Sequence, residues 1–290
     1  MGPSTSKGAE VAKIVVTGGS GKAGRVVVRD LHEHGHEVRN VDRVPSPESY
    51  SPDTPVPYLP ADLTDFGQTL EALDGADAIV HLAAIPSPGH ATRDVVFRNN
   101  ITSTHTVFSA AERLGVPRVV WASSETTLGL PFDVPPDYAP VDEQHVRPES
   151  SYALSKVLGE EMARQFSRWS GMTIIGLRLS NVLVRDDYRR FPEYWDDPHA
   201  RKWNLWSYVD ESHVALAVRC ALEADVEGAD SFIIAAADSV MRRPSRELMA
   251  ELFPGVPVAD DLPEHGTLLG IDKARRVLGY DPDWSWRELF

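Results

Sequence analysis

The chain has 290 residues, of which 42% are hydrophobic and 25% are charged, a composition typical of a globular protein with a large core. Its formal net charge of -14 at pH 7 argues against binding to nucleic acid or to an anionic membrane. Every apolar run is shorter than the roughly 18 residues that cross a membrane, and residues 1–10 lack the apolar core of a signal peptide. We therefore expect a cytoplasmic protein that begins with a disordered tail, residues 1–10.

Neither the cysteine nor the histidines predict a metal site. The single cysteine, Cys220, lies inside an apolar helical pattern, so it can form no internal disulfide and is expected in the core. His32, His34 and His36 lie across a helix end and the start of the next strand, where solvent exposure explains them better than metal binding. We therefore expect no metal centre.

The stretch Val11–Arg25 predicts a phosphate-binding turn. A β-branched run is followed by Gly18, Gly21 and Gly24, and then by an apolar-patterned helix over Arg25–Glu33. Gly18 permits a sharp turn, Gly21 lets the backbone approach a ligand, and Gly24 lets the helix pack closely on the strand. Free N–H groups and the positive end of the helix dipole then meet at one point, which suits a pyrophosphate. Such turns are also common as purely structural features, so the residues that follow decide whether this one binds a dinucleotide.

The second predicted strand, His36–Val41, is followed by Asp42. An acidic side chain there can accept hydrogen bonds from both adenosine ribose hydroxyls, and its charge would repel a 2′-phosphate. The adjacent Arg43 could instead hold a 2′-phosphate or lie over the adenine. We therefore predict NAD as the cofactor, with Arg43 leaving NADP open.

Strands and helices continue to alternate along the chain. Helices are predicted at Phe66–Leu73 and Arg93–Leu114, and strands at Ala78–Leu82 and Arg118–Ser123. This alternation predicts an α/β fold, a Rossmann-type doubly wound parallel sheet whose ligands bind at the carboxyl ends of the strands. We expect an NAD-binding core at residues 11–180 and a small C-terminal substrate lobe at 181–290, interleaved with the last strands of the core.

Ser124 lies just past the strand Arg118–Ser123, where a hydroxyl would point toward a bound cofactor. Alone, it could equally be a polar strand end that bonds its own backbone. The next predicted helix, Ser151–Ser167, carries Tyr152 and Lys156 four residues apart and therefore on one face. Because this pair follows Ser124 in a sheet already expected to bind a nucleotide, Ser124, Tyr152 and Lys156 are the candidate catalytic residues.

Candidates for cofactor binding come from the glycine turn, the strand ends and the helix with Tyr152. Small residues after the strand Ala78–Leu82 would let the cofactor contact the backbone. The full set is Gly18, Ser20, Gly21, Lys22, Gly24, Asp42, Arg43, Asp62, Leu63, Leu82, Ala83, Ala84, Asn100, Tyr152 and Lys156.

These motifs together resemble the extended short-chain dehydrogenase/reductase family, in its NAD-dependent epimerase/dehydratase group. The matching stretches are TGGSGKAG at Thr17–Gly24, SSETTLG at Ser123–Gly129, YALSK at Tyr152–Lys156, LRLSNV at Leu177–Val182, YVDES at Tyr208–Ser212 and IDKARRVLGY at Ile271–Tyr280. They occur in the family's order and span nearly the whole chain.

The resemblance implies an enzyme in which Tyr152 is the general base. Lys156 and the positive nicotinamide would lower the pKa of Tyr152 toward neutral, and Lys156 would also hold the nicotinamide ribose. Ser124 would hydrogen-bond the reacting hydroxyl while a hydride passes to NAD. A non-catalytic dinucleotide-binding protein is disfavoured, because such members of the fold typically lose the Tyr or the Lys.

Within this family the chain is most similar to the uronate dehydrogenases, which oxidise the anomeric carbon of a free sugar acid. The similarity rests on a short second half and on DDYR at Asp186–Arg189. After the active-site hydroxyl, dehydratases carry an Asp-Glu pair and uronate dehydrogenases an Asn-His pair, whereas this chain has Glu125 and Thr126. Dehydration is therefore disfavoured and the substrate stays open. A nucleotide-sugar 4-epimerase with tightly bound NAD is the alternative.

The aromatic and basic segment Phe191–Trp206 lies where a second lobe should cover the active site. Arg189 beside it offers a bidentate fork for a carboxylate, which favours an aldohexuronic acid or another small anionic sugar as substrate. The predicted substrate-binding residues are Ser87, Ser124, Glu125, Thr126, Asn181 and Arg189.

The helices Arg93–Leu114 and Ser151–Ser167 carry apolar residues beyond a single stripe, for instance Val95, Val96 and Val107. Such width suggests burial against the sheet on one side and against a second copy of the chain on the other. We therefore predict a homodimer.

Overall fold

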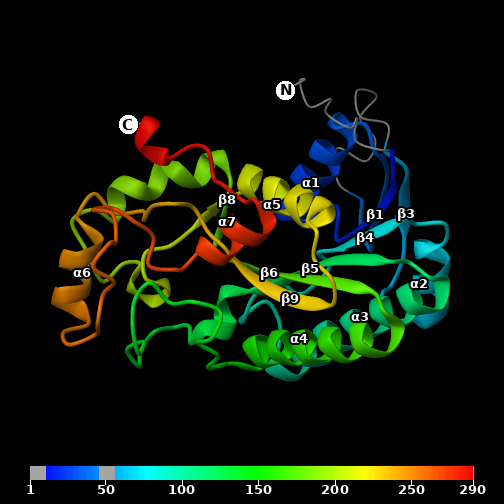
Figure 1. The fold of residues 1–290 in the computed structure, drawn as a ribbon, viewed down its shortest axis with the longest axis horizontal. Coiled ribbons are helices and arrows are strands. Elements are labelled where there is room, and N and C mark those ends of the chain that lie inside the picture. Colours follow the sequence, from blue (N-terminus) through cyan, green and yellow to red (C-terminus); the bar gives the residue numbers. More distant parts are fainter. Residues whose placement is uncertain (1–10, 46–55, 290) are drawn as a thin grey trace, which may run out of the picture.

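The computed structural model describes residues 11–45 and 56–289, so the tail expected at residues 1–10 lies outside the described part of the chain. A parallel seven-stranded sheet runs through the centre of the molecule, in the order β3-β2-β1-β4-β5-β6-β9 (Figure 1). Its strands are β1 (Lys13–Thr17), β2 (Glu37–Asp42), β3 (Tyr58–Pro60), β4 (Ala78–His81), β5 (Arg118–Ser124), β6 (Thr173–Leu179) and β9 (Ala229–Ile234). All neighbouring strands pair in parallel, as expected from the alternating elements.

Helices cover both faces of the sheet (Figure 1). One face carries α1 (Lys22–Glu33), α5 (Glu211–Glu223) and α7 (Asp272–Leu278), and the other carries α2 (Phe66–Leu73), α3 (Arg93–Leu114) and α4 (Ser151–Ser170). The strand order changes direction at β1, which is flanked by β2 and β4. In a doubly wound sheet, such a reversal opens a crevice at the carboxyl ends of the strands.

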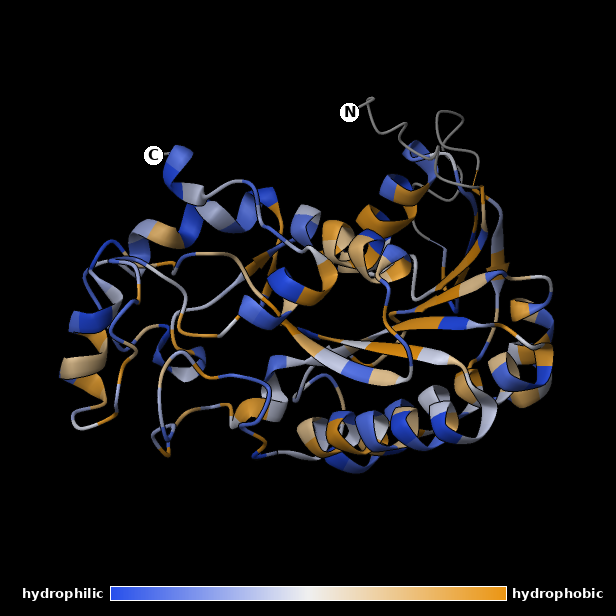
Figure 2. Ribbon diagram, viewed as in Figure 1, coloured by the Kyte–Doolittle hydropathy of each residue, from blue (hydrophilic) through white to orange (hydrophobic). Residues whose placement is uncertain are grey.

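The strands are apolar on both sides, because each face of the sheet is covered by helices (Figure 2). On β1, Ile14 and Val16 pack under the α1 and α5 face, whereas Val15 packs with α2 and α3 on the other face. Alternate residues of a strand point to opposite faces, so one short strand contributes to two cores. Cys220, expected in the core, is half-buried at the margin of the α5 face.

A third hydrophobic cluster lies beyond the sheet, in the lobe that contains α6 (Ser245–Leu252). Segments far apart in sequence build it, including Leu128–Val141, Leu183–Tyr208 and Ala235–Trp286. A small separate sheet pairs β7 (Val182–Leu183) with β8 (Val209–Asp210) in parallel. The lobe thus draws on residues 128–141, which the boundary expected at residue 180 assigned to the NAD-binding core.

Two helices extend beyond their predicted ends. Helix α1 begins at Lys22 rather than Arg25, because Gly21 is its N-cap and Gly24 lies within its first turn. Helix α4 continues to Ser170, where Gly171 ends it with a φ of +77° that a side chain would disfavour. Strand β5 includes Ser124, so the candidate catalytic hydroxyl is the last residue of the strand.

The apolar width of α3 has an explanation within one chain. Val107 and Phe108 are fully buried, and α3 packs against both α2 and α4 as well as the sheet. Val95, at 39%, is the exposed member of the expected set. The breadth of the stripe therefore reflects neighbouring helices, and the homodimer stays a prediction. Within the described ranges, none of the helices is both long and apolar enough to traverse a bilayer.

Candidate active site

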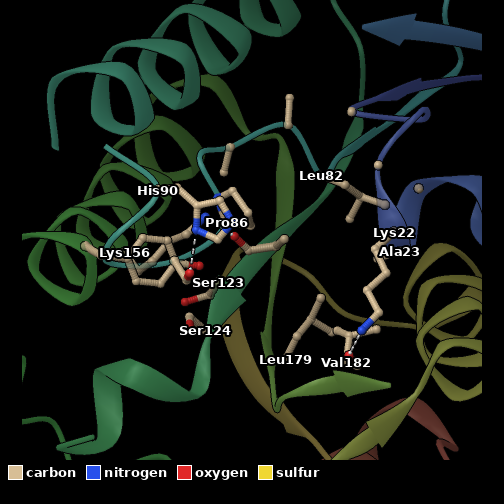
Figure 3. A pocket seen from close by; sticks show the side chains of 18 of the residues that line it. Lys22, Ala23, Leu82, Pro86, His90, Ser123, Ser124, Lys156, Leu179 and Val182 are labelled. Carbon is tan, nitrogen blue, oxygen red and sulfur yellow. Dashed lines mark hydrogen bonds between the residues drawn. The ribbon is translucent and has the colours of Figure 1, made fainter. Parts of the chain in front are cut away.

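A cavity of about 950 Å³ lies along the carboxyl ends of β1, β2, β4, β5 and β6. Every residue predicted to bind cofactor or substrate, or to act in catalysis, lines it, with the exceptions of Asn100 and Arg189. In Figure 3, Lys22, Ala23, Leu82 and Val182 gather at one side of this cavity, and Ser123, Ser124, Lys156 and His90 at the other. The parallel sheet accounts for the convergence, because all its carboxyl ends share one edge.

The glycine turn is packed so tightly that side chains would not fit. A Cβ on Gly18 would come within 2.5 Å of the backbone nitrogen of Ala83, and one on Gly24 would overlap the carbonyl oxygen of Gly18. Gly18 also has a φ of +72°, which disfavours any other residue. No side chain caps the start of α1 at Gly21, so its first N–H groups remain available to an anion. These features support the phosphate cradle expected from the sequence, which stays a prediction.

The end of β2 presents Asp42 to the cavity. Its carboxylate accepts hydrogen bonds from the backbone N–H of Ser20, at 3.1 Å, and of Arg43, at 2.7 Å. Asp62 also lines the cavity, and its pKa is lowered chiefly by hydrogen bonds from the backbone and hydroxyl of Thr64, with a smaller contribution from the charge of Arg43. Both carboxylates can accept hydrogen bonds from ribose hydroxyls, and negative side chains at this position suit a ribose better than a phosphate.

Lys22 crosses from the glycine turn to the second half of the chain (Figure 3). Its ammonium group donates to the carbonyl oxygen of Val182, at 2.7 Å, and to the carboxylate of Asp187, at 2.6 Å. Partial burial would raise the pKa of Asp187, but the hydrogen bonds from Lys22 and from the N–H of Val184, with the charge of Lys22, lower it. The side chain predicted to bind cofactor thus also bridges the two walls of the cavity.

Helix α4 carries Tyr152 and Lys156 into the cavity from one side, opposite the last residue of β5. Tyr152 is 7% exposed, and the ammonium group of Lys156 donates to the carbonyl oxygen of Ala122 at 2.7 Å. That group lies 5.7 Å from the centre of the Tyr152 ring. The Ser124 hydroxyl accepts hydrogen bonds from the backbone N–H and the hydroxyl of Thr126, at 3.2 and 3.0 Å. The three candidate catalytic residues therefore surround one point of the cavity.

The ionisation of this group differs from the sequence-based expectation. Burial raises the pKa of Tyr152 to about 12, with a further increase from the charge of Glu125 and an opposing hydrogen bond with Ser124. Burial lowers the pKa of Lys156 to about 8, while the charge of Glu160 opposes the change. The protein alone thus does not lower the pKa of Tyr152, because a neutral phenol is favoured in a buried site. A lowered value requires additional positive charge in the cavity.

Close packing and a buried ion pair fix the position of α4. A Cβ on Gly159 would come within 2.7 Å of the Trp121 ring, so only a glycine lets the helix lie this close to β5. Glu160 forms an ion pair with Arg178 of β6 at 2.8 Å, and it also accepts a hydrogen bond from Ser123 at 2.6 Å. Removing one partner of such a buried pair costs about 3–5 kcal/mol. The pair therefore holds the Tyr152 helix firmly against the strand that ends in Ser124.

Glu125 is only 4% exposed and belongs to a buried polar network. One carboxylate oxygen accepts from the Ser180 hydroxyl at 2.6 Å, and the other lies 3.5 Å from the side-chain nitrogen of Asn204. Burial raises the pKa of Glu125 to about 7, opposed by the Ser180 hydrogen bond and then by the charge of Arg201. Glu125 lines the cavity as predicted, but its carboxylate is already engaged by the protein.

Two predicted site residues lie outside the cavity. The side chain of Asn100 donates to the carbonyl oxygen of Ile85 and accepts from its N–H, so it braces the loop after β4. Its neighbour Asn99 lines the cavity instead. The side chain of Arg189 is 82% exposed and pairs with Asp186 at 3.3 Å. In the turn Arg185–Glu193, buried Tyr188 and Phe191 face the lobe core, so Arg189 points into solvent.

Among the cavity residues, His90 was not predicted, and Trp203 was predicted only as part of the segment Phe191–Trp206 expected to cover the active site. His90 lines the cavity and its Nδ1 lies 2.8 Å from the hydroxyl of Ser87. Trp203 lines it from the lobe, about 80 residues beyond Ser124. Neither residue belongs to a motif with a fixed spacing, so only the folded chain shows that both line the cavity. Among the described residues, no group of three or more His, Cys, Asp or Glu side chains is arranged to hold a metal ion.

Comparison with known proteins agrees with this geometry. Residues 14–195 match the model of the NAD dependent epimerase/dehydratase family. The NAD-dependent glucose-6-phosphate dehydrogenase of Haloferax volcanii is 28% identical over 93% of this chain and 92% of its own length. The uronate dehydrogenase of Pseudomonas putida is 29% identical over 63% of this chain and 66% of its own. The chain therefore belongs to the NAD dependent epimerase/dehydratase family, and the family assignment made from its motifs is confirmed.

The fold assignment is confirmed as well. A short-chain dehydrogenase/reductase superfamily protein from Agrobacterium tumefaciens, solved with bound NAD, is 25% identical and has a TM-score of 0.71. The match covers 96% of this chain and 94% of that structure. The protein is thus an NAD-dependent enzyme of the sugar dehydrogenase and epimerase type, built on a Rossmann-type sheet.

Proposed function

We propose that this protein is a dehydrogenase that uses NAD to oxidise a hydroxyl of a free sugar or sugar acid and then releases the reduced cofactor. The observation that carries the proposal is the meeting of Ser124, Tyr152 and Lys156 at one point of a cavity whose other end is the glycine turn. We call the part lined by Gly18–Gly24, Asp42 and Asp62 the dinucleotide end. The part lined by Ser87, His90, Ser124–Thr126, Asn181 and Trp203 is the sugar end.

The residues of the dinucleotide end suit NAD. The uncapped start of α1 offers N–H groups to the pyrophosphate, and the glycine turn leaves no side chain in its way. Asp42 would accept hydrogen bonds from the adenosine ribose, and its charge disfavours the 2′-phosphate of NADP. Arg43, which lines the same wall, is the residue that would accommodate NADP if the preference were reversed.

At the sugar end, side chains of this chain would accept the proton of the substrate hydroxyl. Bound NAD supplies the hydride acceptor and a positively charged ring. Tyr152 would take the proton of the substrate hydroxyl at its phenolic oxygen, as general base. Ser124 would donate a hydrogen bond to the substrate oxygen as negative charge develops there. The charge of Lys156, buried beside Tyr152, and that of the bound nicotinamide would together favour the phenolate. The substrate would then leave with its hydroxyl oxidised to a carbonyl.

The experiment is to incubate the pure protein with NAD or NADP and a panel of free sugars, sugar acids and nucleotide sugars. A dehydrogenase produces reduced cofactor in proportion to the sugar consumed. A nucleotide-sugar 4-epimerase would interconvert two sugars with no net reduction, and a non-catalytic binding protein would do neither. Either of the last two results would overturn the proposal. A preference for NADP would make Arg43, and not Asp42, the residue that decides cofactor choice.

A further inference from the structure

The turn that carries Trp203 has an unusual backbone. Leu205 and Trp206 have φ angles of +52° and +54°, a left-handed conformation that bulky residues rarely adopt, and both are fully buried. The N–H of Leu205 donates to the carbonyl oxygen of Lys202, and that of Trp206 to the carbonyl oxygen of Arg201, each at 3.0 Å. Strained conformations of this kind persist where surrounding contacts enforce them, and they concentrate at functional sites.

The strained turn is tied to the catalytic strand through buried polar groups. Asn204 donates to the carbonyl oxygen of Ser207 at 2.8 Å, and its side-chain nitrogen reaches the carboxylate of Glu125, the residue after Ser124. The guanidinium group of Arg201, 7% exposed, donates to the same Ser207 oxygen at 3.0 Å. The position of the turn is thus coupled to the position of Ser124.

These contacts hold one indole at the cavity wall. The Arg201 guanidinium group lies 5.1 Å from the centre of the Trp203 ring, and the Trp203 carbonyl oxygen accepts a hydrogen bond from the N–H of Phe132. Although the residues around it are buried, Trp203 keeps 38% of its surface exposed and lines the sugar end. A large aromatic surface held at the sugar end can anchor the C–H groups of a sugar ring.

The charged residues that line the cavity indicate whether it suits neutral or acidic sugars. Its basic lining residues in the described chain are Lys22, Arg43, His90 and Lys156, of which the first two belong to the dinucleotide end. Lys156 donates to the carbonyl oxygen of Ala122 beside Tyr152, and Arg201, which donates to the Ser207 carbonyl, does not line the cavity. His90 is therefore the basic lining residue of the sugar end that lies outside the catalytic group, and the acidic Glu125 lines the same end. This wall suits a ring with hydroxyls better than a ring with a carboxylate.

We propose that Trp203 is the platform on which the ring of an uncharged sugar rests, and that stacking on Trp203, rather than a basic side chain, selects the substrate. This inference rests on the proposed function and names the substrate class of the same site. It predicts that neutral aldoses are oxidised with higher kcat/KM than the corresponding uronic acids.

The first test compares Trp203→Ala, Trp203→Phe and Trp169→Ala. Trp169 is the matched control, since it is 51% exposed on α4 and does not line the cavity. With D-glucose, D-galactose and their uronic acids, Trp203→Ala should raise the KM for the neutral sugar about tenfold while kcat and NAD affinity stay close to normal. Trp203→Phe should restore most of the loss, and Trp169→Ala should behave as wild type.

Two results would overturn the proposal: a KM for neutral sugars that Trp203→Ala leaves unchanged, or a wild type that prefers the uronic acids. A binding experiment separates this inference from the dehydrogenase proposal. Saturation-transfer NMR with the same sugars and bound NADH reports contact without turnover. Sugar contact that disappears in Trp203→Ala supports the platform even if no sugar is oxidised. Absence of any contact with the wild type refutes the platform.

Discussion

The two ends of the cavity are built from different parts of the protein. The dinucleotide end consists mainly of backbone, with glycines whose missing side chains and free N–H groups form the surface. The sugar end consists of side chains that reach in from β5, from the loop after β4 and from the strained turn of the lobe. Backbone sites bind a constant ligand, whereas side-chain sites vary with each substitution. In this chain, single side-chain substitutions should therefore change substrate choice more readily than cofactor choice.

Tyr152 stands where the two ends meet, and its loss should have the largest effect. Tyr152→Phe keeps the buried ring and removes the proton acceptor, so kcat should fall by about a thousandfold while NAD affinity is retained. Steady-state rates and an NAD titration of the same preparation measure both. Near-normal turnover would show that Tyr152 is not the general base.

Glu125 should make the free energy of unfolding of the protein depend on pH. Its pKa is raised from 4.5 to about 7, so between these values the folded protein holds a proton that the unfolded chain has released. The free energy of unfolding therefore decreases as the pH rises through this window, by up to about 3 kcal/mol. Glu125→Gln should remove that decrease, as measured by urea unfolding at about pH 5 and about pH 8. Identical pH dependence in the variant would assign the effect to another group.

Substituting a single glycine of the dinucleotide end should weaken NAD binding. Gly18→Ala places a methyl group against Ala83, so NAD affinity should fall about 30-fold, or about 2 kcal/mol. Gly35→Ala is the matched control, because Gly35 also has a positive φ, of +88°, but no atom within 4 Å of the added Cβ. Both variants should lose stability, and only the first should lose NAD binding. Equal NAD affinities by calorimetry would mean that the turn is not the cradle.

Asp42 is the exception at the dinucleotide end, because its side chain should set the preference for NAD over NADP. Asp42→Ala removes both the ribose hydrogen bonds and the repulsion of a 2′-phosphate, so the preference for NAD over NADP should decrease about tenfold. The ratio of kcat/KM for the two cofactors measures it. An unchanged ratio would leave selection to Arg43 or to the nearby Asp62.

The bridge from Lys22 to Asp187 should contribute least, although it joins the two walls. Both side chains are partly exposed, at 46% and 35%, and such pairs contribute about 1 kcal/mol or less. Lys22→Met and Asp187→Asn should each change NAD affinity about threefold, and the double variant should add little more. Lys13→Met, which removes the exposed pair with Glu37, serves as control. Additive losses in the double variant would show that the two residues act separately.

The same contrast explains what could be predicted from the sequence. The glycine turn, Asp42 and the Tyr152–Lys156 pair are local patterns, in which spacing along the chain fixes spacing in the fold. Trp203 and His90 depend on where loops come to rest, and no local pattern encodes that. Arg189 was wrongly expected in the cavity because its neighbours resemble a known motif. In the structure, Tyr188 and Phe191 bury themselves and turn Arg189 outward.

The hydrophobic cluster of the lobe limits how this enzyme could be re-engineered. Leu128, Leu130 and Phe132 from the middle of the chain interdigitate with residues that follow Leu183 and with the C-terminal Trp286. Substrate specificity therefore does not reside in one continuous segment that could be exchanged alone. In a chimera that exchanges only residues 181–290 with a relative, residues 128–141 would pack against side chains that do not fit them. Recombination has to move the three segments together, or redesign side chains one at a time within the native lobe.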